Sequence, residues 1–117
     1  MNGPTLGSIL LGSSAPQRLR DWYCAAFERT TNQHGFIDFG ATALLIDGRT
    51  DVGPVNHEPG RYILNFHVAD ARGTAAHLDT LGVSWLVPLE ERPDGLFGTL
   101  LDLDGNYLQL IQLNADY

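Results

Sequence analysis

Hydrophobic and polar residues alternate along the chain with a period that changes several times, and each change predicts a new element. Residues 6–11 form a mostly apolar run bounded by glycine and serines, which predicts a buried strand. Serines and a proline at residues 13–16 are a helix start signal, and apolar residues then recur at helical spacing through Phe27. Short apolar runs separated by glycine-containing corners predict three strands, at residues 30–33, 35–39 and 42–46.

The same order of elements is predicted again after an irregular stretch. Residues 51–60 are rich in glycine, proline and polar residues, which is typical of a linker. A strand at residues 62–68 precedes a helix for which Asp70 is the expected N-cap and Gly82 the C′ glycine. Residues 90–95 are expected to be a loop among the last three strands, which are predicted at residues 84–89, 97–101 and 106–113.

The chain is therefore predicted to be one domain, residues 1–117, in which the order strand, helix and three strands occurs twice. The first module spans about residues 5–50 and the second residues 61–115. Aligning residues 8–26 with residues 63–81 keeps the apolar positions in phase. In the final strands the alignment places Leu44 at the position of Gln109.

The last strand is predicted in more detail. Asp104 and Gly105 have the chemistry of a tight corner, because glycine adopts positive φ without a Cβ clash. Side chains alternate along a strand, so Tyr107, Gln109 and Ile111 share one face. The intervening leucines are expected in the core.

Composition and charge exclude several classes of function. The 117 residues are 44% hydrophobic and 18% charged, which is ordinary for a folded domain. The formal charge is −7, and the basic residues are all arginine and scattered, so nucleic acid is not an expected partner. We find no apolar run of membrane-spanning length and no signal sequence, and we expect a cytoplasmic protein. A single cysteine, Cys24, permits neither an intrachain disulfide nor a cysteine-based metal cluster.

Three segments carry a resemblance to a known superfamily. They are APQRLRDWY, FHVADARGTAAHLDTLGV and LLDLDGNYLQLIQL. Together they resemble the vicinal oxygen chelate superfamily, which includes glyoxalase I, extradiol dioxygenases, fosfomycin-modifying enzymes and bleomycin-binding resistance proteins. Residues 102–106 are similar to its Asp-Pro-Asp-Gly-Asn turn, with Leu103 replacing the proline. The resemblance implies an α+β fold of two βαβββ modules, a curved mixed sheet around a cup with the helices on its outer face, and a homodimer.

The resemblance also places the metal-ligand positions of the superfamily. In this chain they are Ser8, Leu44, Ile63 and Gln109. Leucine and isoleucine supply no donor atom, so we expect no metal and no other cofactor. A register shifted by two residues is the alternative that would introduce a divalent metal, through Asp47 or through Asn65 and His67.

A ligand-binding set follows from the expected cavity face. An apolar wall with a few polar groups is typical of a small-molecule pocket. His67 is a candidate general base because an imidazole can take up and release a proton near neutral pH. The acidic residues at positions 90, 91 and 94 would favour a cationic guest. The strands are expected to contribute Ser8, Asn65, His67, Tyr107 and Gln109, and the rim Trp85 and Phe97.

Three functions remain open from the sequence. The first is metal-free binding of a small molecule, with sequestration of a cationic or aromatic ligand. The second is a lyase, isomerase or dioxygenase-like enzyme of the same fold, which uses His67 as base or a shifted metal site. The third is a dimerising structural or regulatory module. Fold alone does not choose among them, because function resides in the site.

Overall fold

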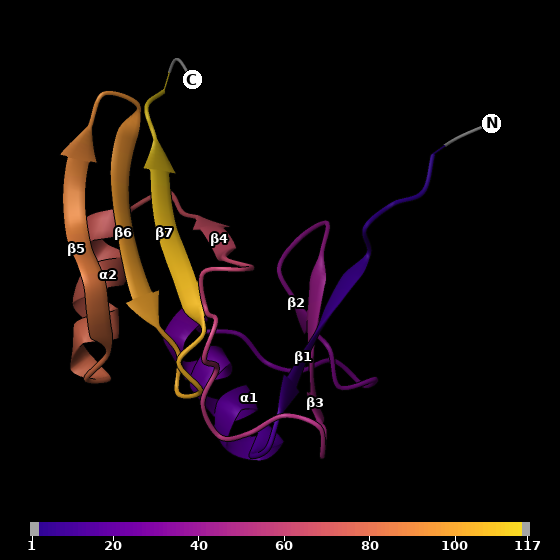
Figure 1. The fold of residues 1–117 in the computed structure, drawn as a ribbon. Helices are drawn as coiled ribbons and strands as arrows, with labels where there is room; N and C mark the ends of the chain where they lie inside the picture. Colours follow the sequence, from indigo (N-terminus) through magenta and orange to yellow (C-terminus); the bar gives the residue numbers. More distant parts are fainter. Residues whose placement is uncertain (1–2, 116–117) are drawn as a thin grey trace. The chain divides into compact units, whose positions relative to one another are not determined.

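The structure is a computed structural model in which residues 3–115 are described (Figure 1). The chain divides into two compact units, with the boundary between Pro54 and Val55. We call the described parts of these units module 1, residues 3–54, and module 2, residues 55–115. Each module combines one helix with one mixed sheet, so the fold is α+β as predicted. No helix in residues 3–115 has the length and apolar character that crossing a membrane requires.

Module 1 packs one helix against a three-stranded sheet. Its strand order is β1-β3-β2, in which β1 is parallel and β2 antiparallel to β3. The core lies between the helix and the sheet, where Leu19, Tyr23 and Ile46 are almost completely buried. The elements are β1 (Ser8–Ser13), α1 (Pro16–Phe27), β2 (Ile37–Asp38) and β3 (Ala43–Gly48).

The start of α1 agrees with the sequence signal. Pro16 occupies the first turn, where its missing N–H costs nothing. The buried hydroxyl of Ser13 accepts a 3.0 Å hydrogen bond from the backbone N–H of Ala15, the N-cap residue. Ser13 therefore stabilises the turn that precedes the helix. It does not act as the N-cap, which is Ala15.

The strand predicted at residues 30–33 is wrong. Only an isolated bridge from Thr31 to Ile37 forms there. The side chain of Asn32 accepts hydrogen bonds from the N–H groups of His34 and Phe36, at 2.9 and 3.1 Å. This local bonding uses backbone groups that a strand ladder would need, so a turn replaces the strand.

The predicted equivalence of Leu44 and Gln109 is also wrong. In the parallel register Ser8 pairs with Ala43, and Ile9 pairs with Leu44. Because partners in a ladder share a face, Leu44 points to the side opposite Ser8, where it is buried. The alignment of the last strands was out of phase by one residue, and a shift of one exchanges the two faces.

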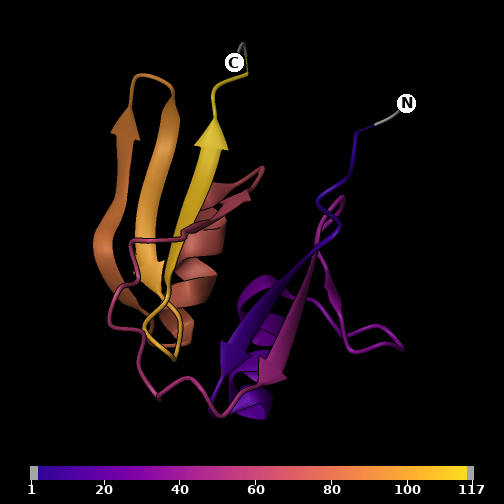
Figure 2. The same ribbon diagram turned by 45° about the vertical axis from the view of Figure 1, so that its right-hand side comes forward.

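Module 2 is the larger unit and has a complete four-stranded sheet. The strand order is β4-β7-β6-β5, with β4 parallel to β7 and the other pairs antiparallel. Figures 1 and 2 show α2 against one face of this sheet. The elements are β4 (Leu64–His67), α2 (Ala71–Thr80), β5 (Ser84–Arg92), β6 (Gly95–Leu101) and β7 (Tyr107–Leu113).

Both ends of α2 match the sequence prediction. The Asp70 carboxylate accepts a 3.0 Å hydrogen bond from the Gly73 N–H, as an N-cap should. Gly82 follows the C-cap with φ 71°, a conformation that favours glycine. In addition, Gln112 Oε1 accepts a 2.7 Å hydrogen bond from the Ala71 N–H, which joins the helix start to β7.

The loop predicted at residues 90–95 is shorter than expected. β5 continues to Arg92, which pairs with Gly95, so that only Pro93 and Asp94 form the connection. Asn114 supports this turn because its side chain donates to the Pro93 carbonyl at 2.7 Å and its backbone N–H to the Asp94 carbonyl at 2.9 Å. The acidic residues 90 and 91 therefore belong to a strand.

The corner between β6 and β7 is organised by a buried carboxylate. Asp102 Oδ1 accepts from the N–H groups of Asp104 and Asn106, at 2.8 and 3.0 Å, and Oδ2 accepts from Asn106 Nδ2 at 2.8 Å. Gly105 has φ 80°, as a tight corner requires. Asn56, in the predicted linker, donates from its backbone to the Asp104 carbonyl at 2.8 Å. The corner thus holds the first residues of module 2 in place.

Candidate functional site

The two faces of the module 2 sheet have different roles. One face packs on α2, and its central residues Leu100, Leu108 and Leu110 are at most 1% exposed. The other face, which we call the open face, is not covered by any helix or strand of module 2 in the described residues. Alternation assigns to the open face Asn65, His67, Phe97, Thr99, Leu101, Tyr107, Gln109 and Ile111.

A row of neutral polar side chains crosses the middle of the open face. Asn65 pairs with Gln109 across β4 and β7, and Gln109 pairs with Thr99 across β7 and β6. Neighbouring strands are about 4.8 Å apart, so the two amides and the hydroxyl form a continuous series of donors and acceptors. We call these three residues the polar row.

The polar row lies between two mostly apolar rows. On one side His67, Ile111 and Phe97 are successive cross-strand partners. On the other side Tyr107 pairs with Leu101. Two aromatic rings thus flank a strip of hydrogen-bonding groups, an arrangement that suits a flat molecule with polar substituents.

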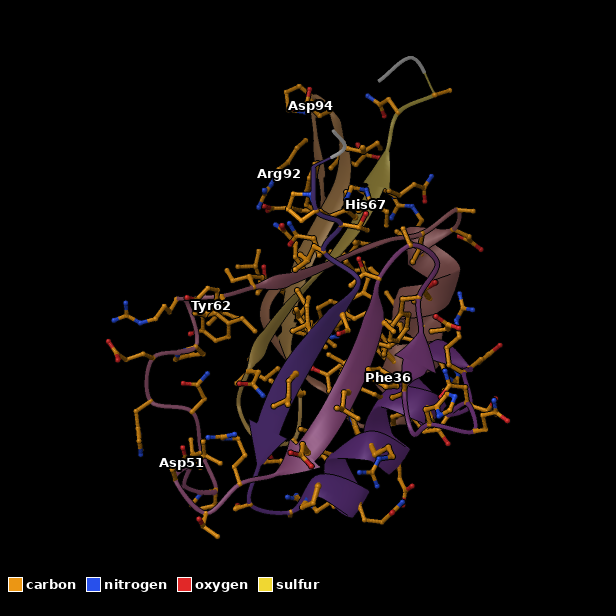
Figure 3. The ribbon with its side chains drawn as sticks, turned by 90° about the vertical axis from the view of Figure 1, so that its right-hand side faces the viewer. Phe36, Asp51, Tyr62, His67, Arg92 and Asp94 are labelled. Carbon is orange, nitrogen blue, oxygen red and sulfur yellow. The ribbon has the colours of Figure 1, made fainter. Side chains whose placement is uncertain are left out.

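The tip of the open face carries a residue that the sequence did not single out. The guanidinium carbon of Arg92 lies 5.0 Å from the centroid of the Phe97 ring, which is a cation–π contact. Arg92 Nε and Nη2 both donate to Glu90 Oε1, at 3.0 and 2.9 Å. Figure 3 shows Arg92 near the tip of the β5–β6 hairpin. The pairing of Glu90 with Phe97 across β5 and β6 brings the three side chains together. This pairing cannot be derived from the sequence pattern, so Arg92 was not predicted.

Trp85 does not belong to this surface. It pairs with Leu100, so its side chain lies on the α2 face, where Nε1 donates a 2.8 Å hydrogen bond to Asp79 Oδ1. The predicted stacking of Trp85 on a ligand at the rim beside Phe97 is therefore corrected. Ser8, the remaining predicted residue, is exposed on β1 of module 1, on the face away from Leu44.

The acidic rim expected at residues 90–94 is largely compensated. Glu90 forms a 2.9 Å ion pair with Arg92, and Glu91 forms a 3.1 Å ion pair with Arg72 of α2. Each pair is solvent exposed, so its contribution to stability is small, but its net charge is zero. Two of the three acidic residues are thus ion-paired, which weakens the argument for a cationic guest.

The side chains on the open face form a poor donor set for a metal ion. Within residues 3–115 no three histidine, cysteine or acidic side chains are grouped in a way that would hold a metal. Asn65 and Gln109 are neutral amides, and the one imidazole beside them belongs to His67. Divalent transition metals favour imidazole, thiolate or carboxylate donors, and the open face does not fit them. The absence of a cofactor stays a prediction.

His67 and Cys24 have side chains with intrinsic reactivity. His67 is exposed on β4 (Figure 3), and among the described residues no carboxylate orients its ring by a hydrogen bond. Burial, assisted by the negative charge of Asp21 and opposed by Arg20, raises the pKa of the Cys24 thiol. A raised pKa lowers the thiolate fraction, so Cys24 is a poor nucleophile.

Comparison with solved structures identifies the fold. No protein-family profile matches the chain, and no curated protein matches it significantly. Among solved structures, the antibiotic-binding protein TnmS3 from Streptomyces sp. CB03234 is similar with a TM-score of 0.73 at 20% identity, over 97% of this chain and 99% of that one. TioX from Micromonospora sp. ML1 has a TM-score of 0.73 at 17% identity, over 96% and 100% of the two chains.

A third similar structure belongs to a named enzyme family. It is a glyoxalase/bleomycin resistance protein/dioxygenase family enzyme from Burkholderia phytofirmans PsJN, with a TM-score of 0.78 at 11% identity, over 95% of this chain and 100% of that one. The fold is that of the vicinal oxygen chelate proteins. At these identities the vicinal oxygen chelate fold is what the likeness establishes. The neighbours include both a binding protein and an enzyme, so the function has to be argued from the side chains.

Proposed function

We propose that this protein binds a small aromatic molecule on the open face of module 2, without a metal, and sequesters it rather than converting it. The observation that carries the proposal is the polar row of Asn65, Gln109 and Thr99 between aromatic and aliphatic neighbours. Neutral polar groups in an apolar wall orient a ligand, and none of the three side chains in the polar row is a histidine, a cysteine or an acid.

The ligand class follows from the chemistry of these groups. Amides and a hydroxyl both donate and accept, so they match carbonyl, hydroxyl or amide substituents on a flat ring. Phe97 and Tyr107 supply aromatic surface on either side of the row. The likeness to an antibiotic-binding protein agrees with a small-molecule ligand. The sequence also suggested a cationic ligand. This alternative is less well supported because Glu90 and Glu91 are ion-paired.

Titration calorimetry with 2-naphthol, a neutral flat probe with one hydroxyl, tests the proposal. We expect saturable binding that weakens about tenfold in Gln109→Ala, because one hydrogen bond to the ligand is lost. Gln17→Ala, on the exposed surface of α1, is the matched control and should bind as the wild type does. The probe should be recovered unchanged by mass spectrometry after incubation.

Other outcomes would reject the proposal. Absence of saturable binding of 2-naphthol and of its oxo- and amido-substituted analogues would exclude an aromatic ligand at this face. Turnover of a bound analogue that is lost in His67→Ala, with binding retained, would favour an enzyme instead. A saturable rise in melting temperature on adding nickel, zinc, manganese or iron(II), abolished in Gln109→Ala, would contradict the metal-free reading.

We also propose that the protein is a homodimer in the cytoplasm. The superfamily resemblance implies dimerisation, and large apolar side chains such as Leu6 and Leu10 of module 1 are 71% and 49% exposed. Burying such side chains is favourable by roughly 25 cal/mol for each Å² removed from water. Light scattering coupled to size-exclusion chromatography measures the mass directly, and a mass of one chain at micromolar concentration would reject the dimer.

A further inference from the structure

We propose that Arg92 is a specificity-determining residue of the open face, and that it selects aromatic ligands with an oxygen acceptor, neutral or anionic, over cationic ones. This inference rests on the proposed function, since it names the ligand class of the same surface. It starts from the cluster of Arg92, Glu90 and Phe97 at the tip of module 2.

The guanidinium of Arg92 is held in place from two sides. Glu90 Oε1 accepts from both Nε and Nη2, at 3.0 and 2.9 Å, and the Phe97 ring lies 5.0 Å from the guanidinium carbon. Two contacts of different kinds restrict the rotation of a long side chain that is otherwise 42% exposed. These contacts therefore lower the entropy cost of placing a donor beside the ligand.

The cluster still has donor capacity after these contacts. Within the described residues Nη1 of Arg92 has no hydrogen-bond partner, although the guanidinium carries five N–H groups in all. A flat ligand that touches Phe97 comes within reach of this donor because the guanidinium lies against the same ring. Charged donors bind carbonyl, phenol and carboxylate oxygens more strongly than neutral donors do.

The same cluster offers little to a cation. The charge of Glu90 is compensated by Arg92, and that of Glu91 by Arg72 on the α2 side. An ammonium group placed near Phe97 would have to share the ring with the guanidinium or displace it from both contacts. A cation would therefore gain contact with Phe97 only by weakening the contacts that Arg92 already makes, so a cationic ligand is disfavoured.

Three probes with the same ring system test the inference by calorimetry. They are 2-naphthol, 2-naphthoate and naphthalen-2-ylmethylammonium. We expect the wild type to bind the first two at least about tenfold more tightly than the ammonium, and Arg92→Gln to remove that preference. Arg92→Lys keeps the charge but lacks the planar fork, and should retain only part of it.

Arg72→Gln is the matched control. It removes the same charge and breaks an equivalent exposed ion pair, but on the α2 side of the sheet, so the preference should stay as in the wild type. Equal affinity of the wild type for all three probes, or an equal effect of Arg92→Gln and Arg72→Gln, would overturn the role of Arg92 and leave the binding function standing. Failure of all three probes to bind the wild type would overturn both proposals.

Discussion

Trp85 and Asp79 are joined by a 2.8 Å hydrogen bond from the indole Nε1 to the carboxylate Oδ1, which ties β5 to α2. The indole also lies over Gly98, where an added Cβ would come within 3.1 Å of the ring. One of the most conspicuous aromatic residues in the sequence is thus part of the packing of module 2, on the face opposite the proposed ligand.

Trp85→Phe should separate stability from binding. The substitution removes the hydrogen bond to Asp79 and should lower the free energy of unfolding by about 1 kcal/mol, with the affinity for 2-naphthol unchanged. Urea unfolding and calorimetry measure the two quantities. Phe97→Leu is the comparison variant on the open face, and it should weaken 2-naphthol binding. If Trp85→Phe were folded and lost binding, the assignment of the two faces would be incorrect.

Gly95→Ala should be strongly destabilising. Gly95 has φ 151°, and a Cβ there would overlap the carbonyl oxygen of Gln112 on β7. The strain and the steric overlap together should lower the free energy of unfolding by more than about 1 kcal/mol. Thermal unfolding provides the measurement. Gly53→Ala, at an open position with ordinary φ, should change stability little, and equal melting temperatures for the two variants would disprove the hairpin register.

Asp102→Ala should loosen the corner between β6 and β7 together with the chain near Asn56. The substitution leaves the N–H groups of Asp104 and Asn106 without their acceptor, which should cost roughly 1–3 kcal/mol. Hydrogen exchange of the Asn56 amide, which bonds the Asp104 carbonyl, should accelerate beyond the change in global stability.

Two further variants calibrate the role of Asp102. Asp102→Asn keeps an acceptor for the backbone groups but turns a donor toward Asn106 Nδ2, so it should fall between the wild type and Asp102→Ala. Asp38→Ala, on an exposed position of β2, should remain within about 0.5 kcal/mol of the wild type. An unchanged exchange rate at Asn56 in Asp102→Ala would show that the carboxylate does not hold this segment.

Cys24 should react slowly with iodoacetamide. Burial and then Asp21 raise the pKa of its thiol, while Arg20 acts in the opposite direction. The alkylation rate should therefore rise at higher pH than for a cysteine in an unstructured peptide, and Asp21→Asn should move the profile back toward lower pH. Because the pKa of the thiol is raised in the folded state, the folded protein keeps this proton up to a higher pH than the unfolded chain does. Its small contribution to stability is present at low pH and is lost as pH rises through the folded-state pKa.

An alkylation profile that matches the free peptide would contradict this picture. Arg20→Gln is the opposite variant, because removing the positive charge should raise the pKa further and slow the reaction. Arg18→Gln removes a charge from the same helix at an exposed position and should leave the profile unchanged.

The local signals in the sequence were sufficient for most elements. Asp70 and Gly82 mark the ends of α2 because capping and positive φ depend on single residue types. The corner at Asp104 and Gly105 could be predicted from the residue types in the same way. The strand predicted at residues 30–33 failed because Asn32 bonds its own neighbours, and that competition has no periodic signature.

The candidate site was predictable only in part. Alternation along β7 correctly places Tyr107 and Gln109 on one face, because the period of a strand is a local property. The pairing of Gln109 with Asn65 depends on the parallel register, and Leu44 shows how one residue of misalignment exchanges two faces.

The resemblance to a known superfamily implied the α+β class. By itself, the sequence determined the repeat of strand, helix and strands, the ends of α2 and the alternation along each strand. These follow from backbone preferences and hydrophobic period, which are encoded in neighbouring residues. Only the tertiary structure decided that Trp85 packs toward Asp79 and that Arg92 lies over Phe97 beside Glu90. Both depend on strand register and on bulges in β5, which are set by packing between segments distant in the chain.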